Sequence, residues 1–523
     1  MLSSSLTQGG TERMFKLAAA VFFVIFAGVL YLPYLTHLPE GIHTWAQADR
    51  LSLALSYYDR GMQFLRPRTY NLSSIDGVVG VEFPIIPYLA ALFGKVFGRG
   101  TVVPAFRGIT IGLSVLACYY LFRMVFERTG SFVAGLVPGI FLLTSPVYAF
   151  YSGNFLPDAP GAALSLVAYY YFLRYYQQPR FRDLALGLVL FTLATLIKTS
   201  AGVYLLAAYG VTLILSYFRN SLFTTRQKVW FLLLMGLSFG AVLGYIFLNK
   251  WLNTTFDSTM FLAEPRPLTT TEEANKTYEE VMRTWWNEYF TQVHYWVLAA
   301  CWLYTFVGAL WNQRREPMLA TQVWVSLLGA LAFLWLMGRQ FGAHDYYILS
   351  PFMPLLLLVL VQTLVRVATL PLPRLAVPTA LGVLAAALLI IGTVRHRARM
   401  SDDYPPFSDF YDYRWMRGGA QLLNQAQVPA DATVLVANET APNIGLVYFD
   451  RRGLAAERFI LQTEPSEVVR FMAERGLDYF IMRRKDSDEL RAAHSTLFSV
   501  LEPVTESADV TVLRRRGRAS AWH

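Results

Sequence analysis

Apolar runs about as long as a membrane span recur along the chain and constrain its fold more than any other feature. Crossing a hydrocarbon core takes roughly 20 apolar residues in a helix. The runs predict about eleven such helices, near residues 15–35, 104–126, 131–150, 160–177, 183–197, 199–218, 229–249, 291–311, 318–337, 346–366 and 375–394. Hydrophobic residues make up 55% of the chain, which excludes an ordinary soluble enzyme. We therefore expect an α-helical polytopic membrane protein.

Basic residues predict the orientation of these helices. The net charge is +9, and Lys and Arg collect in short loops between alternate helices, as they do on the cytoplasmic side of membranes. These loops contain Arg13 and Lys16, Arg123 and Arg128, Arg174, Arg180 and Arg182, Arg219, Arg226 and Lys228, Arg314 and Arg315, and Arg366 and Arg374. The N-terminus is therefore expected in the cytoplasm, and the loops 36–103 and 250–290 outside. A membrane explains the charge, so a nucleic-acid partner is not implied.

Two segments break the pattern of spans. The segment 83–97 is apolar but shorter than a span, and it begins with two prolines, so a helix lying in the membrane interface is expected. After about residue 394 no apolar run is long enough to span. Short strands are predicted at 433–438, 477–482 and 509–514, with an amphipathic helix at 466–476. The sequence thus predicts a membrane domain, 1–394, with its first outer loop at 36–103, and a small α/β soluble domain, 395–523, on the outer face.

Charged and aromatic residues are concentrated in the first outer loop. His43, Asp49, Arg50, Arg66, Arg68 and Glu82 lie there, beside Trp45 and several tyrosines. A helix over 44–60 would place Trp45, Asp49 and Ser52 near one face. Asp49 could accept the proton of a hydroxyl nucleophile, or it could simply pair with Arg50. Glu82 could position a sugar or bind a divalent ion with His294 or His344, or it could cap a helix.

Further polar residues interrupt the later apolar runs. Asp158 begins a predicted helix, where the helix dipole and capping alone would explain it. Lys198 lies inside an apolar stretch, where a cation must reach the interface or bind an anion. A second polar cluster contains His344, Tyr346 and Tyr347, and Arg283 lies in the loop 250–290. These groups could hold a lipid phosphate, although tyrosines at this depth also form aromatic belts.

Familiar catalytic and cofactor motifs are missing from the sequence. It contains no glycine-rich nucleotide loop, zinc-protease helix or paired-cysteine motif. The two cysteines, Cys118 and Cys301, lie in apolar runs and are expected to be core residues. We expect no required cofactor, and a divalent metal ion stays an open alternative.

Several motifs occur in an order that resembles a known family. They are WAQADR around Asp49, EFPIIPYLAALFGKVFG from Glu82, the PD turn at Asp158, KTSAG from Lys198, and HDYYILSPFMP from His344. Together they resemble, over about residues 10–395, the membrane glycosyltransferases of family 39. These have the GT-C fold and include the protein O-mannosyltransferases and the lipid A aminoarabinose transferases.

The resemblance implies an activity and site residues. It implies an inverting transfer from a polyprenyl-phosphate sugar donor to a lipid, glycan or protein acceptor, on the outer face of the bacterial cytoplasmic (inner) membrane. Asp49 matches the family's first-loop catalytic aspartate, Asp158 its second acidic residue, and Glu82 the glutamate before its interfacial helix. The aminoarabinose transferases have a phosphate-binding lysine after that glutamate, whereas this chain has Phe83. The phosphate role therefore shifts toward Lys198, Arg66, Arg68, Arg107 or Arg283.

Two other classes of protein remain open from the sequence. A transporter or flippase for lipid-linked sugars would also have many spans, but transporters often show paired repeats and charges near the bilayer midplane. A structural membrane subunit would leave the charged cluster of the first outer loop unexplained. The glycosyltransferase interpretation accounts for most of these residues.

Overall fold

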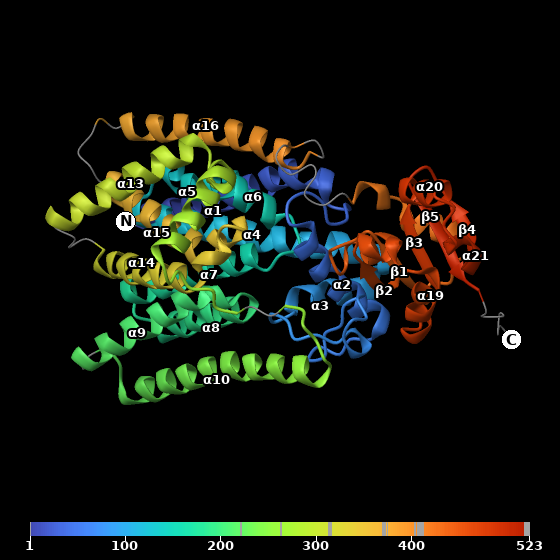
Figure 1. Cartoon of the computed structure of the whole chain (residues 1–523). Coiled ribbons are helices and arrows are strands. Elements are labelled where there is room, and N and C mark those ends of the chain that lie inside the picture. Colours follow the sequence, from blue (N-terminus) through green and yellow to red (C-terminus); the bar gives the residue numbers. More distant parts are fainter. Residues whose placement is uncertain are drawn as a thin grey trace. The chain divides into compact units, whose positions relative to one another are not determined.

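The structure is a computed structural model that describes residues 2–219, 222–261, 264–311, 316–368, 373, 375–401, 404 and 413–516 (Figure 1). Of the basic residues used to predict orientation, Arg314, Arg315 and Arg374 lie outside this set. The chain divides into two compact units. The first contains 1–35, 107–247 and 263–401, and the second contains 36–106, 248–262 and 402–523. The first outer loop therefore shares a unit with the C-terminal residues, whereas the sequence groups it with the membrane helices.

The first unit is helical. Its longer helices are α1 (Leu2–Tyr31), α5 (Phe132–Thr144), α7 (Asp158–Gln177), α8 (Phe181–Ile197), α9 (Gly202–Phe218), α13 (Gln292–Trp311), α14 (Pro317–Met337), α15 (Leu349–Val367) and α16 (Ala376–Arg399). Shorter ones are α6 (Pro146–Ser152), α11 (Thr271–Glu280) and α12 (Trp286–Tyr289). Two more helices, α4 (Val102–Thr129) and α10 (Thr225–Thr255), contribute residues to both units.

Each of the predicted spans coincides with a helix. Within the described residues, seven helices are long and apolar enough to cross a membrane, and the bent pair α5 and α6 would make eight. The pair bends by 75° at Ser145. Pro146 explains the bend, because a proline disfavours helical backbone at the residue before it. The other three predicted spans coincide with α7, α8 and α13. The predicted fold class is confirmed, while the count of eleven spans stays a prediction.

The second unit contains a five-stranded sheet with the strand order β2-β1-β3-β5-β4. The strands are β1 (Thr433–Ala437), β2 (Arg452–Ala456), β3 (Tyr479–Arg483), β4 (Leu501–Glu506) and β5 (Val510–Arg515). Strands β2, β1 and β3 are parallel, and β5 and β4 continue the sheet antiparallel. Leu435 and Ala437 pack with α19 (Pro465–Glu474) in one core cluster, whereas Val436 meets Gly445 of α18 (Ile444–Phe449). Helices thus cover both faces of the sheet.

The sequence predicted the three inner strands and missed the two at the edges. The predicted helix at 466–476 is α19, and Gly476 follows it with a positive φ of 65°. Strand β2 is short and contains a glycine, and β4 contains Pro503 beside a bulge. Glycine and proline weaken the residue pattern that identifies a strand, and proline is tolerated at the edge of a sheet.

The first outer loop forms two helices and joins the sheet. They are α2 (Thr44–Arg60), which matches the predicted bounds, and α3 (Ile85–Phe97), which is shorter than a span. One face of α3 is exposed and apolar, with Leu89, Leu92, Phe93, Val96 and Phe97. Between these helices, Leu72 donates its backbone N–H to the Gly453 carbonyl, and Gly453 donates to the Tyr70 carbonyl. The loop thus lies along β2 at the edge of the sheet.

Candidate active site

Asp49 is buried in the middle of α2. The helix starts at a tight turn in which His43 adopts a left-handed conformation with φ 53°, and the Thr44 hydroxyl donates to the Gly41 carbonyl at 2.6 Å. Seven further residues of the helix between Leu51 and Tyr57 are buried. Asp49 is only 5% exposed. A carboxylate in such a position loses solvation, and it must be stabilised by neighbouring groups.

Asn443, from the loop before α18, provides one of those groups. Its Nδ2 donates to Asp49 Oδ1 at 2.8 Å, and Trp45 also forms a hydrogen bond with the carboxylate. Burial raises the pKa of Asp49 from 3.8 to about 6, and the positive charge of Arg50 and the two hydrogen bonds only partly oppose this rise. The carboxylate is therefore ionised at pH 7 but more basic than an exposed one. Nothing in the sequence alone links Asn443 to Asp49, 394 residues away.

Arg50 and Glu82 form an ion pair in the same unit. Arg50 Nη2 lies 2.8 and 2.9 Å from the two carboxylate oxygens of Glu82, and its guanidinium stacks on Phe261 at 4.5 Å. The chain before Glu82 is fixed by α10, because Asn253 accepts from the Gly80 N–H at 2.7 Å and Asn249 donates to the Val81 carbonyl at 2.8 Å. A side chain at position 80 would lie 2.5 Å from the Asn249 carbonyl, so only glycine fits there. Arg50 thus pairs with Glu82, and Asp49 keeps its carboxylate for other partners.

Arg66 and Arg68 have different partners. Arg68 Nε pairs with Asp76 at 3.0 Å, and Arg60 pairs with the same carboxylate at 2.6 Å. Both arginines hold the pKa of Asp76 below its usual value, against the opposing effect of its partial burial. Arg66 stacks on Phe256 at 4.6 Å, and no carboxylate among the described residues pairs with it. Arg66 is therefore the arginine of this loop that is available for an anionic ligand.

In the first unit, Asp158 and Lys198 form a buried ion pair. Asp158 begins α7 and is 1% exposed, and Lys198 lies in the break after α8. Lys198 Nζ lies 3.1 Å from Asp158 Oδ1. One turn into α7, a side chain at Gly161 would lie 3.0 Å from Lys198 Cβ. The glycine thus lets the lysine approach the helix start, and no local pattern in the sequence connects these two positions.

Three aromatic residues of the second polar cluster lie beside this ion pair. Lys198 Nζ lies 5.7 Å from the ring centre of Tyr346 and 5.8 Å from that of Tyr347. The His344 ring stacks on Tyr347, with 5.4 Å between the ring centres. The structure therefore brings Asp158, Lys198, His344, Tyr346 and Tyr347 together.

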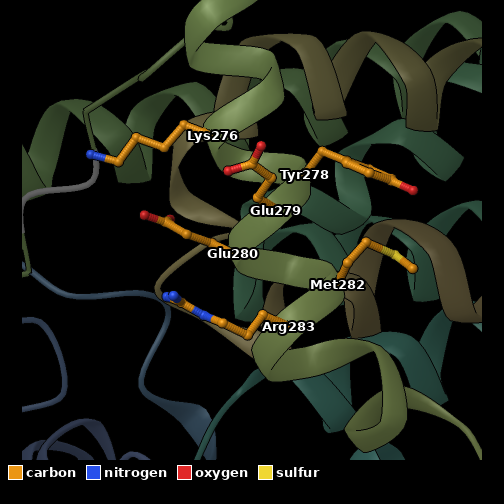
Figure 2. A pocket seen from close by; sticks show the side chains of 6 residues that line it. All are labelled: Lys276, Tyr278, Glu279, Glu280, Met282 and Arg283. Atoms are coloured by element: carbon orange, nitrogen blue, oxygen red, sulfur yellow. The ribbon is translucent and has the colours of Figure 1, made fainter.

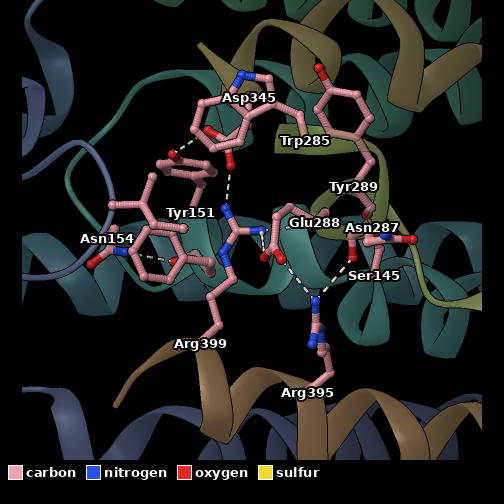
Figure 3. A network of polar contacts seen from close by, with 12 residues as sticks. Ser145, Tyr151, Asn154, Trp285, Asn287, Glu288, Tyr289, Asp345, Arg395 and Arg399 are labelled. Atoms are coloured by element: carbon pink, nitrogen blue, oxygen red, sulfur yellow. Dashed lines mark hydrogen bonds and ion pairs between the residues drawn. The ribbon is translucent and has the colours of Figure 1, made fainter. Parts of the chain in front are cut away.

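A buried network of charges anchors the segment that carries these tyrosines (Figure 3). Asp345 precedes Tyr346, accepts from the Tyr151 hydroxyl at 2.5 Å and pairs with Arg399 at the end of α16. Arg399 also donates to the Glu288 carbonyl at 2.9 Å, and the Glu288 carboxylate accepts from Arg395 at 2.8 Å. Asp345 and the Arg399 side chain are fully buried. Glu288 and Arg399 could not be identified from the sequence, because their link to Asp345 is visible only in three dimensions.

Other predicted residues lie outside these clusters. Arg107 is buried, and it donates to the Gly153 carbonyl and to Asn154 Oδ1, so it fixes the turn before α7. Arg283 lines an open pocket of about 660 Å³ with Lys276, Tyr278, Glu279, Glu280 and Met282 (Figure 2). It lies in the π-helical turn after α11 and makes no ion pair with any described residue. Arg283 therefore stays a candidate for an anion, whereas Arg107 has a structural role.

The residues predicted to bind a metal ion are Glu82 with His294 or His344. Glu82 pairs with Arg50, and the buried His294 contacts Thr144, Thr291 and the Phe141 carbonyl. The described part of the chain contains no group of three or more His, Cys, Asp or Glu residues that could hold a metal ion. The residues named for a metal therefore have protein partners in this structure.

Part of the sequence matches a known family. Residues 82–245 match the family model described as Dolichyl-phosphate-mannose-protein mannosyltransferase. The match includes Glu82, α3, Asp158 and Lys198. No curated protein matches the sequence.

Solved structures share the fold of nearly the whole chain. ArnT from Cupriavidus metallidurans bound to undecaprenyl phosphate has 13% identity and a TM-score of 0.59, over 96% of this chain and 98% of that one. The archaeal oligosaccharyltransferase AglB from Archaeoglobus fulgidus, in complex with an inhibitory peptide and a dolichol-phosphate, has 12% identity and a TM-score of 0.50, over 90% and 70%. The arabinofuranosyltransferase AftD from Mycobacteria has 14% identity and a TM-score of 0.52, over 97% and 40%. The resemblance predicted from the sequence is confirmed.

Proposed function

We propose that this chain, a membrane glycosyltransferase of the GT-C fold, transfers a sugar from a polyprenyl-phosphate donor to an acceptor on the outer face of the bacterial cytoplasmic membrane. The observation that carries the proposal is the buried carboxylate of Asp49, whose pKa burial raises to about 6. A general base works best when its pKa lies just below the working pH, because it is then ionised and still accepts a proton readily. Asp49 meets this requirement at neutral pH.

The chemistry of the transfer needs one proton acceptor. The acceptor hydroxyl attacks the anomeric carbon of the donor sugar, and its proton goes to the Asp49 carboxylate. The bond between that carbon and the phosphate oxygen breaks, and the electron pair leaves with polyprenyl phosphate. Attack from the face opposite the phosphate inverts the configuration. Because a phosphate monoester is a stable anion, the leaving group needs cations beside it rather than a proton.

Two basic groups are the best candidates for holding the donor phosphate. Arg66 is the arginine of the first outer loop for which the described residues provide no carboxylate partner, and Lys198 lies 3.1 Å from Asp158 and beside the rings of Tyr346 and Tyr347. The ArnT structure contains undecaprenyl phosphate and the AglB structure a dolichol-phosphate, which supports a polyprenyl carrier for this chain. A donor of this kind keeps its prenyl tail in the bilayer, so only the sugar phosphate must enter the site.

The proposed mechanism uses no cofactor. Glu82 is held by two hydrogen bonds from Arg50, and protein cations supply the positive charge that the departing phosphate needs. Transfer should therefore continue in the presence of EDTA. Loss of transfer on chelation, restored by added Mg²⁺ or Mn²⁺, would show that a divalent ion takes part.

The test is transfer of radiolabelled sugar from a panel of polyprenyl-phosphate sugars to membrane acceptors. The purified wild type is compared with Asp49→Asn, and with Asp59→Asn as a control on the same helix. Asp59 is exposed and pairs with Arg99, so its variant should keep transfer. Label moved by the wild type and the control, but not by Asp49→Asn, would support the proposal. Movement of intact lipid-linked sugar across a vesicle membrane without transfer would instead support a transporter.

A further inference from the structure

The side-chain amide of Asn443 is buried between two parts of the first outer loop. Its Oδ1 accepts the backbone N–H of Asn71 at 3.0 Å, and its Nδ2 donates to Asp49 Oδ1 at 2.8 Å. Asn443 is fully buried. A backbone N–H can only donate, so the oxygen of the amide must face Asn71 and the nitrogen must face Asp49. The contact with Asn71 therefore fixes Asn443 as a hydrogen-bond donor to the carboxylate.

The loop that carries Asn443 is itself tied to the first outer loop. The Asn71 side chain donates to the Pro442 carbonyl at 2.9 Å, and Tyr448 of α18 donates to the Pro39 carbonyl at 2.9 Å. After α18, Gly453 forms backbone hydrogen bonds with Tyr70 and Leu72, so the chain is tied to the loop both before and after this helix. These contacts hold the amide in place from several directions. A single rotamer of Asn443 is therefore favoured before any substrate binds.

We propose that Asn443, contributed by the C-terminal residues, is a positioning residue that orients the Asp49 carboxylate and keeps it ionised for proton abstraction. The inference rests on the proposed function, in which Asp49 is the base. A donor aimed at a carboxylate stabilises its charged form more than its neutral form. The C-terminal residues then take part in the catalytic apparatus and are more than a cover over it.

Of the two direct donors to the Asp49 carboxylate, Asn443 is the one that comes from outside α2. The positive charge of Arg50 lowers the pKa of Asp49. Its guanidinium is hydrogen-bonded to Glu82, however, and the negative charge of Glu82 raises that pKa. Helix α18 adds Tyr448, whose hydroxyl is occupied by Pro39. Helix α3 also packs on α2, but its Lys95 lies 4.5 Å from the ring centre of Tyr58 and does not act on Asp49. The direct donors to the carboxylate are the side chains of Asn443 and Trp45.

The test uses the full chain with Asn443→Asp, which keeps an acceptor for the Asn71 N–H and removes the donor to Asp49. The matched control is Asn438→Asp in the same loop, because the Asn438 amide donates to Asp486 at 3.2 Å instead. The pH dependence of kcat/KM is measured for both. In Asn443→Asp the acid limb should move up by about two pH units, since two carboxylates then share one site, with kcat reduced and the donor KM unchanged. The control should follow the wild type.

A second readout does not depend on transfer. The carbonyl stretch of protonated Asp49, identified in infrared spectra as the band missing from Asp49→Asn, gives its titration midpoint directly. In Asn443→Ala this midpoint should rise by about one pH unit, because a hydrogen bond to a charged group is lost. An unchanged midpoint in a folded Asn443→Ala protein would overturn the inference. A shifted midpoint in a protein that transfers no sugar from any donor would overturn the proposed function and leave the contact standing.

Discussion

Asp49→Asn should abolish transfer and, at neutral pH, stabilise the protein. The substitution keeps the size of the side chain and an oxygen that can accept from Asn443, but it removes the buried negative charge. Loss of the charge removes the base. It also removes the cost of burying an ion, which the native protein carries whenever Asp49 is ionised. If Asp49 had only a structural role and its ionised form were stabilised by its neighbours, Asp49→Asn would instead destabilise the protein.

The magnitude follows from the pKa. Burial raises the pKa of Asp49 from 3.8 to about 6, so between these values the folded protein binds a proton that the unfolded chain does not. Stability contributed by this group therefore falls as the pH rises through this window, by about 3 kcal/mol in total. The amide of the Asp49→Asn variant does not titrate. The stability advantage of the variant should therefore be complete above pH 7 and should vanish below about pH 4.

The assay is thermal unfolding in detergent, followed by tryptophan fluorescence at a series of pH values. Trp45 and Trp415, both in the second unit, are suitable reporters. At pH 7.5 Asp49→Asn should melt several degrees above the wild type, and at pH 4 the two curves should coincide. Asp59→Asn is the control, and it should lose a little stability because it breaks the ion pair with Arg99. An Asp49→Asn protein that is less stable than the wild type at pH 7.5 would refute the reasoning.

Four further substitutions test the other contacts. Lys198→Met should lower donor affinity at least tenfold and leave a buried carboxylate unpaired, so both equilibrium donor binding and the melting temperature should fall. Arg66→Gln should raise the donor KM with little change in stability. Arg68→Gln should mainly lower stability, because Arg68 pairs with Asp76. If both variants raised the donor KM equally, Arg66 would not be the phosphate-binding residue. Asp345→Asn should cost about 3–5 kcal/mol by leaving Arg399 without its main partner, and a melting temperature equal to that of the wild type would show that the network is not structural.

Local patterns in the sequence were enough to predict most of the helices. Runs of apolar residues locate the membrane helices. In lipid the backbone of a spanning segment must form its own hydrogen bonds, and a helix does so within the segment. Helix α2 has the bounds 44–60 that the sequence suggested, and α7 begins at Asp158, two residues before the predicted span 160–177. The strands β2 and β4 were missed because Gly453 in β2 and Pro503 in β4 weaken the residue pattern that identifies a strand.

The candidate site could be predicted only in part. Asp49, Asp158 and Lys198 stand out locally, because each is a charged group next to apolar residues. Asn443 carries no such signal, since an asparagine before a short helix is an ordinary cap residue. Arg68 has the same charge and nearly the same position as Arg66, and only the structure shows that Asp76 neutralises it. Residue type and position indicate which groups could act, but their partners decide which of them are available.

The pairing of Tyr70 and Leu72 with Gly453 has a consequence for biogenesis. These residues are separated by about 380 positions, so the first outer loop can reach its final form only after residue 453 has been synthesised. Contacts of such long separation form slowly. Until then the edge of β2 is open, and an open edge invites pairing with other chains. On the proposed function, a chain whose synthesis stops before residue 453 should therefore have no transferase activity.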